Sequence, residues 1–233
     1  MKLETLQDLN AERAARRPVI VVTDTANGEQ RLVKARDIAT DPLRTELAKQ
    51  LRMGKSGNVE AGGKKLFLNV YAPTAKLVII GAVHISQALA PLARSLDYDV
   101  TVVDPRTAFA SPERFPDVPL VAEWPDVALP PLNVDHYTAF VAVTHDPKID
   151  DPALMHAFDR DCFYIGALGS RKTHAKRCER LRAQGASDSD VARIHAPIGL
   201  DIGAVSPAEI AVSIMAEITA QLRLAPKEKE EAA

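Results

Sequence analysis

The sequence predicts an α/β fold: a Rossmann-like doubly wound parallel sheet with a small N-terminal α+β unit. From about Lys76 onward, short apolar runs alternate with segments of helical periodicity. Residues 77–80 and 139–143 are continuously apolar, as expected of parallel strands buried on both faces. Each of these apolar runs is followed directly by a glycine or a polar residue. In doubly wound sheets, ligands bind at this carboxyl end of the strands.

The sequence pattern changes near Pro73, and this change divides the chain into two parts. We expect residues 1–73 to form a small α+β domain, residues 74–226 a Rossmann-like domain, and the mixed-charge residues 227–233 a disordered tail. In the first part, strands are predicted at residues 19–22 and 31–33, joined by the Asn27-Gly28 turn. A helix from Asp41-Pro42 to about residue 53 follows, then a hairpin whose second strand covers residues 66–71.

The second part begins with the strand at 77–80 and a helix over residues 85–96 that contains Pro91. Further strands are predicted at residues 100–103, 118–124, 139–143 and 163–168. Asp151-Pro152 has the pattern of a helix start, with aspartate as the N-cap. The last helix is expected to begin at residues 206–209, Ser-Pro-Ala-Glu, which match a capping box.

Composition excludes several classes of protein. The 233 residues are 46% hydrophobic and 26% charged with a net charge of −2, so we expect no nucleic-acid partner. No apolar run approaches the roughly 18 residues of a membrane span, and the N-terminus lacks the apolar core of a signal peptide. We therefore expect a cytoplasmic protein, and Cys162 and Cys178 are expected to be structural.

The first candidate site is the loop Gly81-Ala82-Val83-His84, which follows the first strand of the second part. Small residues at such a turn let backbone N–H groups approach a phosphate at the helix N-terminus, although one glycine also fits a merely structural turn. Asp104 ends the next strand at the spacing of an acidic residue that hydrogen-bonds a ribose 2′-hydroxyl. His84 is expected to be a neutral imidazole that contacts ligand or backbone, or else a capping or packing residue.

Loops at the carboxyl ends of parallel strands converge on one rim. Arg106 is a candidate phosphate contact or an ordinary surface arginine, and His145 and Asp146 are candidate acid–base groups, although neighbours on a loop seldom face each other. No metal site and no catalytic residue is predicted. The full predicted ligand-binding set is Gly81, Ala82, Val83, His84, Asp104, Pro105, Arg106, Thr144, His145, Asp146, Gly169, Ser170 and Arg171.

Six segments together resemble a known family: residues 79–84, 103–106, 144–146, 164–171, 197–204 and 207–211, in that order. The chain is similar over about residues 65–224 to the XdhC/CoxI family, accessory factors for xanthine dehydrogenase and related molybdenum hydroxylases. The resemblance implies a Rossmann domain at the C-terminal side and a role in supplying sulfurated molybdenum cofactor to an apo-hydroxylase. Val83 stands where the family usually has glycine, and residues 54–60 lack the cysteine of the family's Gly-Gly-Cys segment.

The expected ligands are NAD or another dinucleotide and, as transient cargo, the molybdenum cofactor. The expected partners are a molybdenum hydroxylase such as xanthine dehydrogenase, a cysteine desulfurase, and a second copy in a homodimer. The alternatives are an NAD(P)-dependent oxidoreductase and a nucleotide sensor acting through protein partners. No Ser-Tyr-Lys set stands out for the oxidoreductase.

Overall fold

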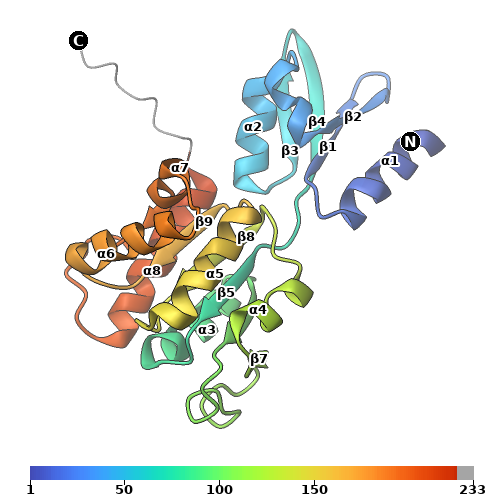
Figure 1. Ribbon diagram of the computed structural model, residues 1–233. Coiled ribbons are helices and arrows are strands. Elements are labelled where there is room, and N and C mark those ends of the chain that lie inside the picture. Colours follow the sequence, from blue (N-terminus) through green and yellow to red (C-terminus); the bar gives the residue numbers. More distant parts are fainter. Residues whose placement is uncertain (225–233) are drawn as a thin grey trace, which may run out of the picture. The chain divides into compact units, whose positions relative to one another are not determined.

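The computed structural model describes residues 1–224 and divides into two compact units (Figure 1). One unit holds Met1–Pro73 together with the described end of the chain from Arg223, and the other holds Thr74–Leu222. The tail expected at residues 227–233 lies outside the described residues. Within residues 1–224, no helix is long and apolar enough to cross a membrane.

The N-terminal unit is a four-stranded antiparallel sheet in the order β2-β1-β4-β3, so the predicted strands and hairpin are confirmed. One face packs on Leu47 of α2, and the other packs on Leu9 of α1, a helix that was not predicted from the sequence. The elements are α1 (Leu3–Ala14), β1 (Val19–Asp24), β2 (Gln30–Lys34), the 3-10 helix η1 (Ala35–Thr40), α2 (Arg44–Met53), β3 (Gly57–Ala61) and β4 (Lys64–Tyr71).

The predicted start of α2 was wrong by a few residues. The helix begins at Arg44, and Leu43 rather than Asp41 is its N-cap. The Asp41 carboxylate accepts a 2.9 Å hydrogen bond from the Leu43 backbone N–H, and it also pairs with the Arg31 guanidinium on β2. Asp41 therefore stabilises the turn before the helix, and its ion pair with Arg31 connects that turn to the sheet.

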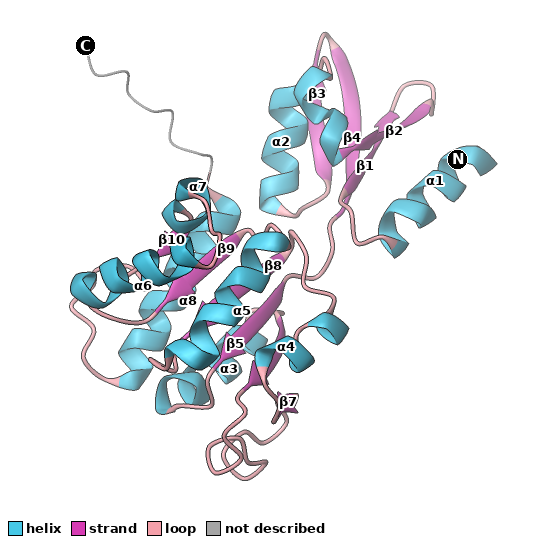
Figure 2. Ribbon diagram, in the orientation of Figure 1, coloured by secondary structure: helices cyan, strands magenta, loops and turns pink. Residues whose placement is uncertain are grey.

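The second unit contains six parallel strands in the order β10-β9-β8-β5-β6-β7, which confirms the predicted fold class (Figure 2). The strand β5 pairs with β6 on one side and β8 on the other, so the winding direction changes there. The elements are β5 (Lys76–Ile80), α3 (His84–Ser95), β6 (Asp99–Val103), β7 (Leu120–Val121), α4 (Pro125–Ala128), η2 (Pro130–Leu132), β8 (Thr138–Ala142), α5 (Pro147–Asp159), β9 (Tyr164–Ala167), α6 (Arg171–Ala183), α7 (Asp188–Ala192), β10 (Ile194–His195) and α8 (Pro207–Arg223).

Helices cover both faces of the parallel sheet. Leu154 of α5 belongs to the same buried cluster as Phe140 of β8, on one face. Ile214 of α8 belongs to a second cluster with the neighbouring Val141, on the other face. Successive residues of β8 thus point into two different cores, which explains why its sequence is apolar without alternation.

Two predicted elements of the second unit need correction. The strand expected at residues 118–124 shrinks to the two residues of β7, because it lies at the sheet edge and is preceded by Pro119, which has no N–H to donate. The helix expected to start at Asp151-Pro152 begins at Pro147, capped by Asp146, whose carboxylate accepts a 2.9 Å hydrogen bond from the Lys148 N–H. Asp151 is buried inside α5 and pairs with Arg180 of α6.

The capping box of the last helix is confirmed. The backbone N–H of Glu209 donates to Ser206 Oγ at 3.3 Å, and the Ser206 N–H donates to Glu209 Oε2 at 2.7 Å. Both orphan donors at the helix start are thereby satisfied. This prediction held because every residue of the motif lies within four positions and needs no tertiary partner.

Candidate functional site

The loops after β5 and β8 touch at the point where the winding of the sheet reverses. Gly81 has φ +118°, and a Cβ added there would lie 2.8 Å from Thr144 Cγ2 and 3.3 Å from the Thr144 backbone nitrogen. Glycine is therefore required at this position by its conformation and by close packing between two loops. Gly81 and Thr144, both predicted site residues, are brought together by this contact.

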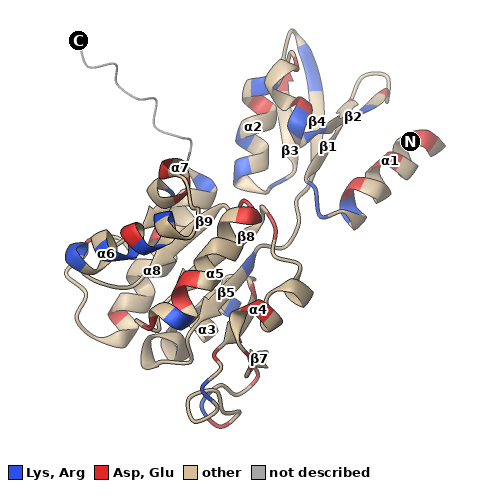
Figure 3. Ribbon diagram, in the orientation of Figure 1, with Lys and Arg blue, Asp and Glu red and all other residues tan. Residues whose placement is uncertain are grey.

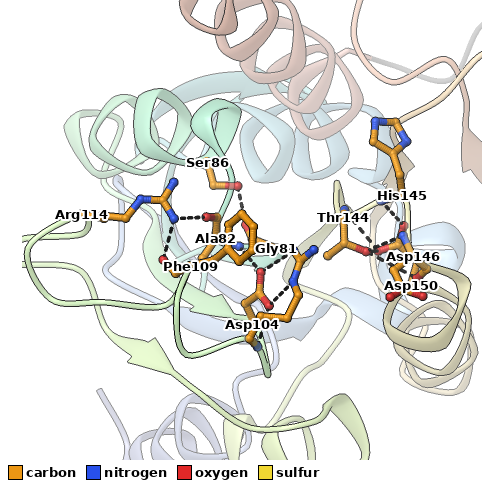
Figure 4. Close-up of polar contacts among 11 residues, drawn as sticks. Gly81, Ala82, Ser86, Asp104, Phe109, Arg114, Thr144, His145, Asp146 and Asp150 are labelled. Carbon is orange, nitrogen blue, oxygen red and sulfur yellow. Dashed lines mark hydrogen bonds and ion pairs between the residues drawn. The ribbon is translucent and has the colours of Figure 1, made fainter.

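Asp104 forms the centre of the next part of the rim. Its side chain is fully buried and accepts hydrogen bonds from the backbone N–H groups of Ala82 (2.8 Å) and Arg106 (3.0 Å), and from the Arg106 guanidinium through Nε (2.9 Å) and Nη2 (2.7 Å) (Figure 4). Burial alone would raise the pKa of this carboxyl, but the donors from Arg106 and Ala82 outweigh it, so the pKa lies below its ordinary value.

These contacts change the role expected for Asp104. The sequence assigned its carboxylate to a ribose 2′-hydroxyl, but in this structure protein donors occupy both oxygens and the side chain has no exposed surface. Arg106 lies over it with 32% of its own side chain exposed. The group presented to a ligand at the end of β6 is therefore a guanidinium rather than a carboxylate.

A second arginine, which sequence reasoning did not single out, flanks the glycine loop. Arg114 Nη1 donates to the carbonyl oxygens of Ala82 (3.0 Å) and Phe109 (2.8 Å), and Nη2 donates to Gln87 Oε1 at 3.2 Å. The Phe109 ring lies 4.5 Å from the Arg106 guanidinium and 5.7 Å from that of Arg114. Two guanidinium groups thus lie close to one aromatic ring beside the loop. Figure 4 labels Phe109 and Arg114.

The helix α3 starts at this loop without a side-chain cap. Its N-cap is Val83, whose side chain cannot accept a hydrogen bond, and Ser86 Oγ donates back to the Gly81 carbonyl oxygen at 2.5 Å. His84 is exposed at the first helical position and does not cap the helix, so the capping alternative for this histidine is wrong. Among residues 1–224 no side chain caps this helix, so the positive end of its dipole and its first N–H groups can receive an acceptor from a ligand.

The loop after β8 is organised by a buried aspartate that sequence reasoning missed. Asp150 is 2% exposed and accepts hydrogen bonds from Thr144 Oγ1 (2.6 Å) and the His145 backbone N–H (3.1 Å). Burial raises the pKa of Asp150. Sequence reasoning missed Asp150 because it predicted that the helix starts at Asp151, whereas Asp150 lies in the first turn of that helix.

His145 and Asp146 do not form an acid–base pair. His145 is exposed, with φ +64°, and its ring points away from Asp146 in Figure 4. Asp146 uses its carboxylate to cap α5. The pKa of Arg106 is raised first by its hydrogen bonds with Asp104 and further by the charges of Asp104, Asp146 and Asp150.

The loop after β9 is held by its own helix. Ser170 is the N-cap of α6, with Oγ accepting a 3.2 Å hydrogen bond from the Thr173 N–H. Gly169 has φ +135°, and an added Cβ would meet Thr173 Cγ2 at 3.1 Å. Arg171 is exposed at the start of this basic helix (Figure 3). These three predicted residues therefore have clear structural roles, and their contact with a ligand stays a prediction.

The cysteines are not available as nucleophiles. Cys162 and Cys178 are both buried, and burial raises the pKa of the Cys162 thiol to about 12. Cys178 Sγ lies 3.4 Å from His174 Nε2 in α6. Among residues 1–224, no group of three or more His, Cys, Asp or Glu side chains is placed to hold a metal ion.

The N-terminal unit contains a cavity of about 660 Å³ at the hairpin end of its sheet. Its apolar wall includes Val22 and Leu66, and its charged side chains include Asp24, Lys64 and Arg31. Lys64 pairs with Asp24 at 3.4 Å, and Arg31 pairs with Asp41. Each of these three charged side chains thus has an ion-pair partner within the unit.

A doubly wound parallel sheet with a glycine turn at the switch point defines a Rossmann-type domain. The model of the XdhC Rossmann domain matches residues 77–218, and the chain therefore belongs to the XdhC family.

Its relatives include the Escherichia coli uncharacterized protein YqeB (33% identical over 67% of this chain and 29% of YqeB) and a probable xanthine dehydrogenase subunit from Bacillus subtilis (33% identical over 66% of this chain and 44% of the relative). The Escherichia coli molybdenum cofactor insertion chaperone PaoD is 31% identical over 68% of this chain and 43% of PaoD. The match thus spans less than half of each relative. A crystal structure described as a xanthine dehydrogenase from Bacillus halodurans has the same fold, with a TM-score of 0.66 and 22% identity over 94% of this chain and 67% of that one.

Proposed function

We propose that this protein is an accessory factor that helps to mature a molybdenum hydroxylase of the xanthine dehydrogenase type by holding or delivering the molybdenum cofactor. The observation that carries the proposal is membership of the XdhC family through residues 77–218. The 31% identity to a molybdenum cofactor insertion chaperone and the 33% identity to a probable xanthine dehydrogenase subunit support it.

The rim between β5, β6 and β8 is the proposed nucleotide site, with NAD or another dinucleotide as the ligand. The donor set fits phosphate chemistry: the uncapped N-terminus of α3 lies beside the guanidinium groups of Arg106 and Arg114. Backbone N–H groups and arginine forks are the donors that bind phosphate best. The half-buried Val83 narrows the approach over the loop.

The proposed role in holding the molybdenum cofactor does not include carrying sulfur as a cysteine persulfide on this chain. Both cysteines are buried, and the Cys162 thiol stays protonated at neutral pH because burial raises its pKa to about 12. A cysteine desulfurase partner would therefore sulfurate the cofactor or the hydroxylase without a persulfide on this protein. We also propose a homodimer, supported by the exposed apolar side chains of Leu200, Ile202 and Val205 before α8.

Native mass spectrometry tests the ligand part of the proposal. The full chain is mixed in separate runs with molybdenum cofactor, NAD, NADP and FAD, and the bound masses and the number of protomers are read from the same spectra. The proposal expects a molybdenum cofactor adduct and at least one nucleotide adduct. An absence of every adduct at millimolar ligand would count against both binding roles.

The same samples separate this role from that of an oxidoreductase. An NAD(P)-dependent enzyme needs a general acid or base beside the nicotinamide. His145 and Asp146, the candidates for that role, do not support each other, because the His145 ring points away from Asp146 and Asp146 caps a helix. NAD and NADP should therefore bind without being reduced when candidate purine and aldehyde substrates are added. Steady formation of NADH or NADPH above the rate of a protein-free sample would favour the enzyme.

A further inference from the structure

We propose that the rim selects nucleotides that carry a phosphate on the ribose 2′ position, and that Arg106 is the residue that determines this specificity. The inference rests on the proposed nucleotide site. It replaces the hydrogen bond between Asp104 and a ribose 2′-hydroxyl that the sequence predicted.

The position of Arg106 matches that of a 2′-phosphate reader. In doubly wound folds, the ribose next to the adenine lies at the carboxyl end of the second strand, where a carboxylate recognises hydroxyls and an arginine recognises a 2′-phosphate. Here the second strand is β6, and Asp104 directly after it is fully buried beneath Arg106. A ribose at this strand end meets the guanidinium first.

Arg106 is also held in place before any ligand arrives. Its Nε and Nη2 donate to Asp104 at 2.9 and 2.7 Å, and its Cζ lies 4.5 Å from the centroid of the Phe109 ring. Among the described residues, its Nη1 has no hydrogen-bond acceptor, so both of its N–H groups are left to donate. Because the side chain is already ordered, little rotamer entropy is lost when a phosphate binds.

The charges around Arg106 indicate that selectivity for a 2′-phosphate must come from hydrogen bonds that Arg106 donates to it, rather than from the net charge of the rim. Asp104 lies beneath the guanidinium, and Asp146 and Asp150 act on it from the loop after β8. Arg114 adds a second cation beside Phe109. Three carboxylates thus stand against two guanidinium groups, so a phosphate placed elsewhere on the same ribose gains little from the net charge of the rim.

A charge-matched experiment on the wild-type full chain tests this preference. Isothermal titration calorimetry compares adenosine 2′,5′-bisphosphate with adenosine 3′,5′-bisphosphate, which has the same charge, and with adenosine 5′-monophosphate. We expect the 2′,5′ ligand to bind about tenfold more tightly than either of the others, as one charge-assisted contact would give. The same order is expected for NADP over NAD.

Two variants assign the effect to Arg106. Arg106→Gln leaves the buried Asp104 without its counter-ion and can impair folding, so Asp104→Asn/Arg106→Gln is made beside it to remove both charges. Either variant should bring the three affinities to within about twofold of one another. Arg94→Gln, which removes an arginine from the last turn of α3, should keep the wild-type preference.

Each outcome decides the matter. Equal wild-type affinities for the 2′,5′ and 3′,5′ ligands would overturn the specificity but leave the nucleotide site standing. No binding of any ligand would overturn the nucleotide site as well. A wild-type preference that survives in the folded double variant would show that another residue reads the 2′-phosphate.

Discussion

The Asp104 carboxylate accepts a 2.8 Å hydrogen bond from the Ala82 backbone N–H, which fastens the end of β6 to the loop after β5. The same carboxylate orients Arg106. One buried aspartate therefore sets both the path of the glycine loop and the cation beside it.

Replacing Asp104 should destabilise the protein strongly. Asp104→Ala leaves the Ala82 N–H and the Arg106 guanidinium without their acceptor, and we expect a loss of about 2–4 kcal/mol in the free energy of unfolding. Urea denaturation followed by circular dichroism measures it. Asp99→Ala, at the exposed start of β6, is the control and should change stability by less than about 0.5 kcal/mol. Equal losses in the two variants would contradict the role assigned to Asp104.

The effect of Asp104 should depend on pH in a defined direction. Its pKa in the folded protein is lowered, so its charge stabilises the fold above the ordinary value of about 3.9, and this contribution is lost as the pH falls through the folded pKa. The stability gap between wild type and Asp104→Asn should be constant from pH 7 to 5 and shrink below about pH 4.

Asp150 has the opposite shift, because burial raises its pKa and protonation then favours the folded state as the pH falls. Since it is present in both proteins, the difference between them isolates Asp104. The measurement is urea unfolding of both proteins across this pH range. A gap that stays constant in acid would mean that the folded pKa of Asp104 is not lowered.

Gly81→Ala should cost more stability than alanine at an unobstructed glycine. At Gly81 the new Cβ meets Thr144 Cγ2 at 2.8 Å with φ +118°, whereas at Gly28, with φ +73°, nothing lies within 4 Å. We expect a loss of about 1 kcal/mol for Gly28→Ala and about 2–4 kcal/mol for Gly81→Ala. Adding Thr144→Ser, which removes Cγ2 but keeps the hydroxyl bound to Asp150, should recover part of the loss. Thermal unfolding of the wild type, Gly28→Ala, Gly81→Ala and Gly81→Ala/Thr144→Ser measures these losses of stability.

Neither cysteine should react in the folded protein. Cys162 and Cys178 are buried, and the pKa of Cys162 is about 12. Iodoacetamide at neutral pH should leave both unmodified in intact-mass spectra over an hour and modify both in denaturant. Rapid modification of a folded sample would reopen a sulfur-carrying role for this chain.

Local patterns predicted much of the fold but only part of the site. The buried strands and the Ser206–Glu209 capping box are encoded within a few residues, so they could be found directly. The start of α5 could not, because Asp146-Pro147 and Asp151-Pro152 satisfy the same local rule, and only the tertiary pairing of Asp151 with Arg180 separates them.

The organisation of the rim depended on contacts between distant segments. Arg114 reaches Ala82 across 32 positions of sequence, and no local spacing indicates that contact. The placement of Asp104 at the end of β6 was predicted correctly, but not its burial under Arg106. Arg106, two positions further along the chain, is therefore partly exposed at the site where sequence spacing alone predicted the Asp104 carboxylate.

The most direct test of the proposed function is the molybdenum content of the partner hydroxylase in a strain that lacks this protein. The hydroxylase is purified from the deletion strain, from the parent and from the complemented strain, and molybdenum per polypeptide is measured together with cyanide-releasable sulfur and activity. The proposal predicts a hydroxylase that is expressed and folded but poor in sulfurated cofactor, with recovery on complementation. Fully loaded and fully active hydroxylase from the deletion strain, with no second copy of the gene present, would contradict it.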